Sequence, residues 1–329
     1  MTSSAPPSTA ELARWVEQLG RTVVEVAPLA GDVSFRRYFR VGLRHGTAVL
    51  AWYPPELADR FAAFIETTAL LEGIGVRVPT ILERSDDARF MLLEDGGDLA
   101  LADLPAGSLR VERHYRQSLD YATRIAALPA DCIPESNAPL DEAVLRRELD
   151  LTWRVFLERE LAADACLRRD LQKALEALCS ALGRRRPVPC HRDLMARNLL
   201  VARNLLVDSA APGLEQREGL WLLDHQDLRL GPPHYDVASL LHDSSRLGAE
   251  QVERFESELL APSERADYAR VCVQRLFKIV GTFHSFAARG DSRHLHRVPA
   301  ALADAALELR DVPEGVDVAP ALEERWRAR

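Results

Sequence analysis

The chain has 329 residues, of which 47% are hydrophobic, enough for a large buried core in one domain or in two closely packed lobes. Its formal net charge is −8. A protein that binds duplex nucleic acid normally carries a basic field, so this balance argues against nucleic acid as the main partner. No apolar run approaches the ~18–20 residues that a membrane span requires. The first residues, MTSSAPPSTA, lack the basic and apolar regions of a signal peptide. We therefore expect a cytoplasmic protein with no membrane partner.

Two details of the composition constrain the chemistry. The five cysteines are scattered and form no C-x-x-C pair, which is typical of reduced thiols. The basic charge is almost all arginine, because Lys173 and Lys278 are the only lysines in the sequence. Only these two residues could therefore serve as a catalytic lysine.

The first hundred residues show mainly the patterns of strands. A short helix capped by Ser8 or Thr9 comes first. β-Branched and alternating runs separated by turn signals then predict strands. Residues 56–71 have the apolar spacing of a helix. The strands are expected within 22–31, 34–43 and 46–55, with two more within 76–97 that turn at 85–87. This part of the chain is a small sheet with one inserted helix.

From about residue 98 the apolar spacing is mainly helical. Between the helices, short apolar runs within 188–208 and 219–224 flank polar loops and predict hairpin-like strand pieces. A charged tail ends the chain. We expect an α+β protein with lobes at 1–97 and 98–329 that share one cleft. The helices are expected at 108–128, 140–162, 164–183, 235–246, 249–260, 263–288 and 297–309.

One constellation of polar residues indicates the chemistry. Asp193 lies in His191-Arg192-Asp193, after an apolar strand; Asn198 follows with four residues between, and Asp224 ends the apolar run LWLLD. This order resembles the kinase catalytic loop, H-R-D-x-x-x-x-N, followed by a metal-binding aspartate. Phosphoryl transfer needs a carboxylate near the acceptor hydroxyl and hard oxygen ligands for Mg²⁺. We interpret Asp193 as the catalytic base, and Asn198 and Asp224 as the metal ligands.

A local repeat offers a second asparagine. The letters ARNLLV occur at 196–201 and again at 202–207, so Asn204 repeats Asn198. Asn198 has the required offset from Asp193. If the chain is extended, Asn204 lies roughly 20 Å further along and cannot reach the same metal. We interpret the second copy as the arm of a β-hairpin.

The residues around Asp224 point to a family. The segment LLDHQDLRLGPPHYDVASLLHD, at 222–243, resembles the aminoglycoside phosphotransferase and choline kinase superfamily through Asp224, Gly231, Pro232, Asp236 and Ala238. Within that superfamily, several pieces are similar to the bacterial anomeric N-acetylmuramate and N-acetylglucosamine kinases. They are GDVSFRRYFR, YPPE, LLEDGGD, HRDLMARNLL, DHQDLRLGPPHYD and LFKIVGTFHSFAARGD, and they run from residue 31 to residue 291.

The resemblance implies a bilobal protein-kinase-like fold that uses ATP and Mg²⁺. Gly31 and Ser34 would lie in the loop over the ATP phosphates, and Leu93-Glu94 would be the hinge that receives adenine. Asp236 would be a structural carboxylate that holds the catalytic loop. Asp227 could line the acceptor pocket or cap a turn, and both alternatives stay open.

The implied reaction is transfer of a phosphoryl group to the anomeric hydroxyl of an N-acetylated amino sugar. The small-molecule product, a sugar 1-phosphate, would feed a nucleotidyltransferase in the recycling of cell-wall precursors. His284, in the middle of a predicted helix, could touch the substrate, although a half-buried histidine without that role is the simpler interpretation.

The sequence departs from the kinase pattern at two places. The third strand, TAVLAWYPP, carries no lysine, and neither does the rest of the first lobe. Arg36, Arg37 and Arg40 are the nearest replacements, with Arg36 and Arg40 on one face of a strand, unless this is only a solvated basic strand. Glu66 could orient such an arginine.

The second departure is Met195. The sugar kinases tend to carry a histidine two places after the catalytic aspartate, and protein kinases carry a lysine. Methionine cannot donate a strong hydrogen bond, so Arg197 is the candidate to replace that residue. Two alternative functions follow. One is a kinase for another small alcohol, such as an aminoglycoside, a choline-like amine or a homoserine-like acid. The other is a catalytically weak kinase-like regulator.

Overall fold

The computed structural model describes residues 6–29, 36–203, 218–242 and 247–326. The chain divides into two compact units, each assembled from several segments. The first comprises Met1–Leu104, Cys132–Asn137 and Arg197–Leu228; the second comprises Pro105–Asp131, Ala138–Ala196 and Arg229–Arg329. The chain passes from the second unit to the first within the motif that carries Asp193 and Asn198. The expected lobe boundary at residue 97 stays a prediction.

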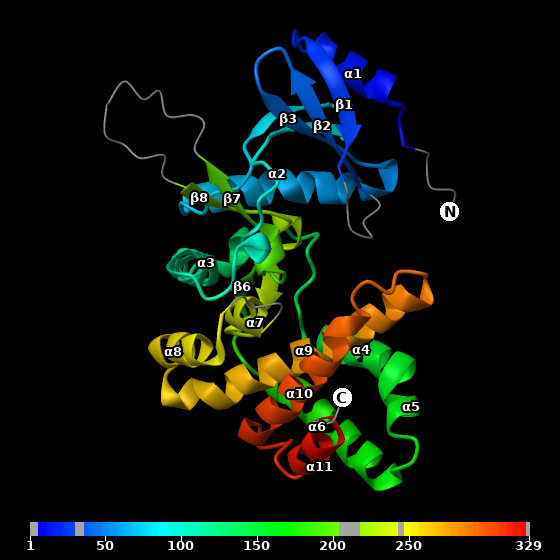
Figure 1. Ribbon diagram of the computed structural model, residues 1–329, viewed down its shortest axis with the longest axis vertical. Coiled ribbons are helices and arrows are strands. Elements are labelled where there is room, and N and C mark those ends of the chain that lie inside the picture. The colour runs from blue at the N-terminus through cyan, green and yellow to red at the C-terminus, as the bar shows by residue number, and fades with distance from the viewer. Residues whose placement is uncertain (1–5, 30–35, 204–217, 243–246, 327–329) are drawn as a thin grey trace. The chain divides into compact units, whose positions relative to one another are not determined.

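The first unit is built on a five-stranded antiparallel sheet with the order β1-β2-β3-β5-β4 (Figure 1). Its strands are β1 (Val23–Pro28), β2 (Arg37–Leu43), β3 (Thr47–Trp52), β4 (Ile81–Arg84) and β5 (Phe90–Glu94), with helices α1 (Thr9–Gln18) and α2 (Ala58–Gly73). A separate hairpin of β7 (Leu199–Arg203) and β8 (Glu218–Leu222) completes the unit. The expected sheet with one inserted helix is confirmed.

The two helices cover opposite faces of this sheet. Side chains of a strand alternate between its faces, and β3 shows the consequence. Leu50 and Trp52 pack with Leu12 and Val16 of α1. Ala51 and Tyr53, the alternate positions, pack with Phe61 and Phe64 of α2. The turn chemistry also agrees with the sequence: Ser8 forms a capping box with Glu11, and Gly46 takes a φ of +83° between β2 and β3.

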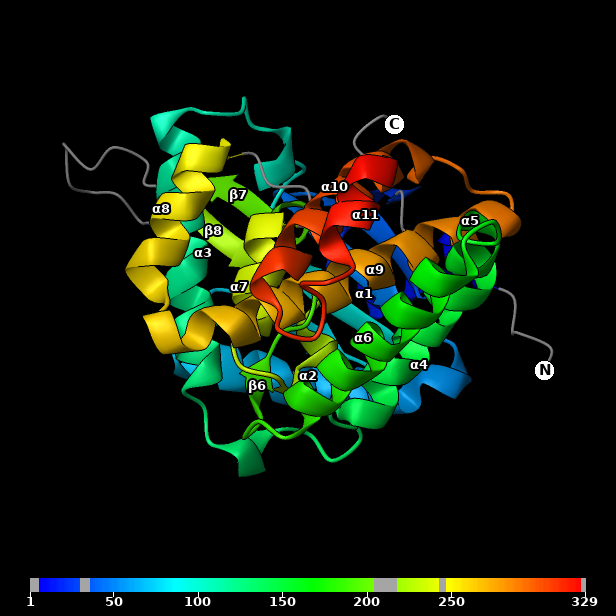
Figure 2. The same ribbon diagram turned by 90° about the horizontal axis from the view of Figure 1, so that it is seen from below.

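The second unit is mainly helical. Its helices are α3 (Leu109–Ala126), α4 (Glu142–Thr152), α5 (Glu158–Glu160), α6 (Ala165–Gly183), α7 (Tyr235–His242), α8 (Ala249–Leu259), α9 (Arg265–Ala288), α10 (Val298–Glu308) and α11 (Ala319–Trp326). Figure 2 shows the long helix α9 passing behind α10 and α11, with α4 and α6 beside it. Most buried side chains of this unit form one core around α9.

Two elements of the second unit differ from the sequence prediction. The charged tail contains helix α11, and its Trp326 is 1% exposed. This helix has only eight residues, too few for its apolar spacing to stand out from the charged residues around it. The strand β6 (Val188–Cys190) pairs with β9 (Arg229–Gly231), a three-residue strand that local periodicity cannot reveal. A π-helical turn at Trp153–Leu157 separates α4 from α5 within the expected helix 140–162.

A close approach between α4 and α9 positions the catalytic residues of the second unit. A Cβ atom added at Gly281 would lie 2.2 Å from Oγ1 of Thr152. The Thr152 hydroxyl also donates to the carbonyl oxygen of Phe277 at 2.7 Å. Only glycine permits this contact, which brings the two helices together along their polar side.

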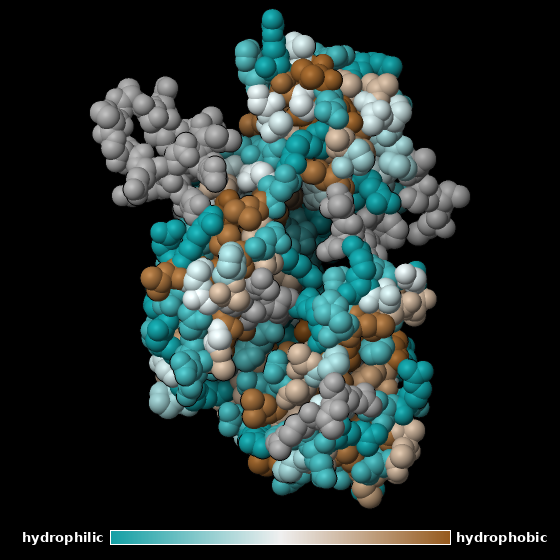
Figure 3. Space-filling model, viewed as in Figure 1, coloured by the Kyte–Doolittle hydropathy of each residue, from teal (hydrophilic) through white to brown (hydrophobic). Residues whose placement is uncertain are grey.

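The side of the molecule seen in Figure 3 is mainly polar. The exposed large hydrophobic residues, such as Leu109 and Val24, are single positions. Among the helices of the described segments, none is long and apolar enough to cross a membrane.

The contact at Gly281 gives a test of this packing. Replacing Gly281 by alanine should lower the free energy of unfolding by about 1–3 kcal/mol, because the methyl group overlaps Thr152 on the adjoining helix. Gly73→Ala is the matched control, since a Cβ at that helical position meets nothing within 4 Å. Urea denaturation followed by circular dichroism measures both. Equal stability of the two variants would contradict the proposed close approach.

Candidate active site

The carboxylate of Asp236 holds the loop that carries Asp193. Asp236 lies in the first turn of α7 and is 5% exposed. Its Oδ2 accepts a hydrogen bond from the backbone N–H of His191 at 2.6 Å, and its Oδ1 accepts one from that of Arg192 at 2.8 Å. Burial raises the pKa of Asp236, and the hydrogen bonds oppose this effect. Arg192 has a φ of 77°, an uncommon value for a side chain with a Cβ. The two hydrogen bonds therefore fix a strained turn immediately before Asp193.

Asp193 is surrounded by positive charge. Its side chain is 31% exposed, and its Oδ1 lies 3.9 Å from Nζ of Lys278 on α9. Burial favours the neutral acid, but the charges of Lys278, Arg192 and Arg275 outweigh burial and hold the pKa of Asp193 well below its usual range. The carboxylate is consequently ionised at neutral pH and can accept a hydrogen bond or a proton.

A polar network on α4 and α9 supports this arrangement. Glu148 accepts from Nη2 of Arg192 at 2.8 Å and from Nε2 of Gln274 at 2.9 Å. Nη1 of Arg275 donates to the carbonyl oxygen of Arg192 at 2.8 Å. Burial raises the pKa of Glu148, whereas Lys278 and Arg192 lower it, with a net decrease. The charges around Asp193 thus belong to a connected set within the second unit.

The predicted metal ligands lie in the first unit, at one end of the β7–β8 hairpin. Leu199 is opposite Leu222, and the N–H of Leu223 donates to the carbonyl oxygen of Asn198 at 2.8 Å. Asn198 therefore precedes one strand where Asp224 follows the other. The second copy of the repeat starts on β7, whereas Asn204 lies outside the described residues.

The backbone around Asp224 is held in an unusual conformation. Asp224 has a φ of 62° and begins a 3₁₀ turn, His225–Asp227. His225 is fully buried, and its Nε2 lies 2.8 Å from the hydroxyl of Thr68 on α2. The amide of Asn137 donates to the carbonyl oxygens of Gln226 and Leu228, each at 2.9 Å. These contacts hold the turn that follows Asp224.

Arg36 forms an ion pair with Asp224. Its Nη2 donates to Oδ1 of Asp224 at 2.8 Å, and the side chain is only 11% exposed. The guanidinium lies 5.8 Å from the ring centre of Tyr38 and 6.0 Å from that of Tyr53. Burial opposes its charge, but Tyr38 and Asp224 raise the pKa of Arg36, so the cation is retained. A fixed positive charge therefore adjoins the predicted metal ligand.

The residues present suit a magnesium ion. Asn198 and Asp224 offer amide and carboxylate oxygens, the donors that Mg²⁺ prefers. Asp224 keeps 42% of its side chain exposed although Leu222, two residues earlier, is fully buried. Its Oδ1 also accepts from Nε2 of Gln226 at 2.7 Å. A carboxylate that is oriented by neighbours and still accessible can serve as a metal ligand.

The other arginines near the predicted phosphate loop have different surroundings. Arg40 donates to Asp95 at 2.7 Å and to Asp98 at 2.8 Å, so its charge is already paired. Arg37 is exposed on β2, and Glu66 is exposed on α2. Arg36 is thus the arginine of this hairpin that contacts another predicted site residue. Gly31 and Ser34 lie outside the described residues.

The remaining predicted residues are dispersed. Leu93 is buried on β5, and Glu94 accepts from the hydroxyl of Thr80 at 2.9 Å. Asp227 is paired with Arg60 of α2 at 2.7 Å. His284 stacks on Phe156 with ring centres 4.7 Å apart, and burial lowers the pKa of this histidine. Arg197 is exposed within the short 3₁₀ turn that precedes β7.

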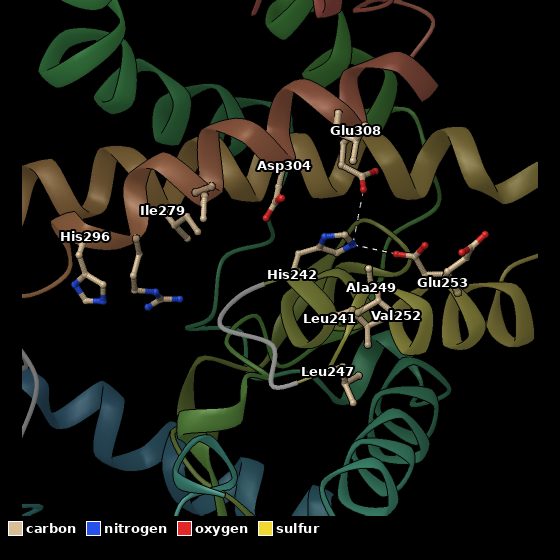
Figure 4. Close-up of a pocket in the computed structure, with 15 residues that line it drawn as sticks. Leu241, His242, Leu247, Ala249, Val252, Glu253, Ile279, His296, Asp304 and Glu308 are labelled. Carbon is tan, nitrogen blue, oxygen red and sulfur yellow. Dashed lines mark hydrogen bonds and ion pairs between the residues drawn. The ribbon is translucent and has the colours of Figure 1, made fainter. Parts of the chain in front are cut away.

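A cavity of about 740 Å³ lies within the second unit and is lined by α7, α8, α9 and α10 (Figure 4). Its lining carries both acids and bases. Nε2 of His242 lies 3.0 Å from Glu256 and 4.0 Å from Glu308. Burial raises the pKa of Glu308 to about 7. His242 is the last residue of α7, and Asp236 lies in the first turn of the same helix. One short helix therefore connects the wall of the cavity with the catalytic loop.

Lys278 and Glu148 are site residues that the sequence analysis did not select. They lie 85 and 45 residues from Asp193 in the sequence, and no spacing rule connects them with the H-R-D loop. The one available signal was the rarity of lysine, which left Lys278 as one of two candidates. Helix packing, rather than local sequence, brings them to the loop.

The hydrogen bonds of Asp236 can be tested directly. Asp236→Asn should make the backbone amides of His191 and Arg192 exchange with solvent roughly 10–100-fold faster, because losing a hydrogen bond to a charged acceptor costs about 1–3 kcal/mol. Hydrogen exchange of the peptide spanning 188–196 measures this. Asp170→Asn, an exposed aspartate on α6, is the control. Unchanged exchange in Asp236→Asn would show that the carboxylate does not hold the loop.

Known relatives match most of the length of the chain. An N-acetylmuramate/N-acetylglucosamine kinase of Pseudomonas aeruginosa is 32% identical over 295 residues, which cover 84% of this chain and 81% of the relative. A protein of the same name from Caulobacter vibrioides is 25% identical over 318 residues, covering 82% of this chain and 84% of the relative. The resemblance inferred from the motifs is confirmed.

Solved structures agree on the fold. A choline kinase from Streptococcus pneumoniae superposes with a TM-score of 0.61 at 14% identity, covering 91% of this chain and 98% of that one. The GDP complex of an aminoglycoside 2'-phosphotransferase gives 0.59 at 17% identity, covering 97% and 98%. The predicted α+β kinase-like fold is therefore confirmed. Residues 25–273 match the model of the phosphotransferase enzyme family, and the chain belongs to that family.

Proposed function

We propose that the protein is an ATP- and Mg²⁺-dependent kinase that phosphorylates the anomeric hydroxyl of an N-acetylated amino sugar, N-acetylmuramate or N-acetylglucosamine. The observation that carries the catalytic part is the ionised Asp193, which follows a turn fixed by Asp236. The sugar comes from the relatives, three of which bear the name of this activity.

In the proposed reaction, Asp193 accepts the proton of the sugar hydroxyl while that oxygen attacks the γ-phosphorus of ATP. A new P–O bond forms, the bond to the bridging oxygen of ADP breaks, and the products are a sugar 1-phosphate and ADP. An ionised carboxylate within reach of the hydroxyl is the group that kinases use for this step.

The nucleotide would be held by residues of the first unit. Gly31 and Ser34 would cover the phosphates, and Leu93 and Glu94 would receive adenine. Asn198 and Asp224 would hold Mg²⁺, which neutralises charge on the phosphates when bound. Arg36 supplies the positive charge that the lysine-free strand β3 lacks, since it adjoins Asp224 and stays charged. The planar guanidinium group of Arg36 can donate two hydrogen bonds side by side to phosphate oxygens.

The acceptor hydroxyl would bind beside Asp193, the proposed base. Roles for Arg197, Asp227 and His284 in substrate binding remain predictions. Asp227 and His284 already contact Arg60 and Phe156. The protein would act in the cytoplasm, where ATP is available, and its product would suit a nucleotidyltransferase.

The sugar specificity can be tested by ADP release from Mg²⁺-ATP with N-acetylglucosamine, N-acetylmuramic acid, glucose, choline and kanamycin. We expect an N-acetylated sugar to stimulate turnover. Asp193→Asn should reduce kcat at least about 100-fold, because the proton acceptor is lost. The product should be a sugar 1-phosphate by ³¹P NMR.

Other outcomes separate the alternatives. Stimulation by choline or kanamycin alone would keep the kinase and reject the sugar. Full activity of Asp193→Asn would reject Asp193 as the base. If no acceptor stimulates turnover while ATP binds, the kinase-like regulator becomes the better description.

The role of Arg36 predicts a nucleotide effect. Arg36→Ala should raise the KM for ATP and lower kcat/KM roughly 10–1000-fold, because a buried charge beside the phosphates is removed. Arg37→Ala, which removes the adjacent exposed arginine, should stay within about twofold. Initial-rate kinetics with ATP varied at saturating sugar measure both. Equal effects of the two substitutions would show that Arg36 has no particular part in nucleotide binding.

A further inference from the structure

The position of Lys278 stands out because lysine is so rare in this protein. The chain has two lysines, Lys173 and Lys278, among 42 basic residues. Lys173 is exposed on α6. Lys278 lies on α9 with 14% of its side chain exposed, and its ammonium is 3.9 Å from Oδ1 of Asp193. Burying most of a lysine is unfavourable unless its charge is paired.

The residues that follow Asp193 on the catalytic loop supply no charge beside it. Leu194 and Ala196 are fully buried, and Met195 is 2% exposed, so the residues that follow Asp193 point into the core. By the resemblance, a basic residue is expected two places after the aspartate, where this chain has Met195. Arg192, which precedes Asp193, is the cation of the loop itself, and Lys278 and Arg275 come from α9.

The neighbouring arginines have other contacts. Arg192 pairs with Glu148 at 2.8 Å. Arg275 donates to the carbonyl oxygen of Arg192 and lies 4.6 Å from the ring centre of Tyr235. Arg275 supports the backbone of the loop, and Arg192 connects the loop to Glu148 of α4. The ammonium of Lys278 lies 3.9 Å from Oδ1 of Asp193, and its charge lowers the pKa of Asp193 and of Glu148.

We propose that Lys278 is a positioning residue for the phosphoryl transfer, supplying from α9 a positive charge that the residues after Asp193 on the loop do not carry, and orienting the carboxylate of Asp193. This inference rests on the proposed function. The separation of 3.9 Å is an ion pair rather than a direct hydrogen bond. The flexible side chain of lysine lets the ammonium stay close to the carboxylate of Asp193 as that carboxylate gains and loses a proton.

The role predicts a specific kinetic pattern. Lys278→Ala should lower kcat at least roughly 50-fold and leave the KM values for ATP and sugar within about threefold, because the charge acts on the base and not on substrate binding. Lys278→Arg should recover at least about tenfold of that loss. Lys173→Ala, which removes the other lysine from an exposed site, should match the wild type. A thermal melt verifies that each variant is folded.

The dependence of kcat on pH separates positioning from mere support of the fold. Lys278 lowers the pKa of Asp193, so its removal raises that pKa. The acid limb of the kcat profile should therefore move to higher pH in Lys278→Ala, and Lys278→Arg should reverse most of this shift. A uniform loss of rate with an unmoved acid limb would overturn the proposal.

A measurement without turnover tests the contact itself. Labelling lysine with ¹³C at Cε gives two resonances, and Lys173→Ala assigns them. Asp193→Asn should shift the resonance of Lys278 and leave that of Lys173 in place. If no acceptor stimulates turnover, the proposed function fails. The shift of the Lys278 resonance does not depend on turnover, so it still tests whether Lys278 and Asp193 form an ion pair. An unshifted Lys278 resonance would overturn the inference even if the sugar kinase activity is real.

Discussion

The catalytic part of this protein depends on two hydrogen bonds, those from the backbone of His191 and Arg192 to the buried carboxylate of Asp236. Together with the hydrogen bond from Arg275 to the carbonyl oxygen of Arg192, they stabilise the left-handed conformation of Arg192. That conformation orients Asp193, and the loop then leads within five residues to Asn198. A single acidic residue at the start of a short helix thus sets the geometry of the predicted base.

The charges beside Asp193 and Asp224 follow a common principle. Tertiary packing brings a cation to each predicted site carboxylate, Arg36 to Asp224 and Lys278 to Asp193. In each case the cation is mostly buried and the carboxylate is more exposed. A buried cation is held in place by its surroundings, while the accessible carboxylate can still exchange partners. In the proposed function, Arg36 takes the part of the strand lysine that this chain lacks.

Most of the first unit could be predicted from sequence because each strand shows its own period. The alternation of β3 assigned its two faces, and the turns at Gly46 and Ser85 contained the expected residues. Prediction failed where an element is short or its apolar residues are few, as in β9 and α11. Such elements are stabilised by their partners, and a single-sequence pattern contains no information about those partners.

The sequence by itself determined the family, since the spacing of Asp193, Asn198 and Asp224 and the motifs around them identified a phosphotransferase, and it predicted these three as the reacting groups. Spacing is informative there because one loop and one hairpin carry all three residues. Only the tertiary structure decided which cations accompany them. Arg36 rather than Arg40 pairs with Asp224, and Lys278 arrives from a helix 85 residues away, where the missing side chain of Gly281 allows α9 to approach α4. Contacts between distant segments depend on packing, which no local pattern records.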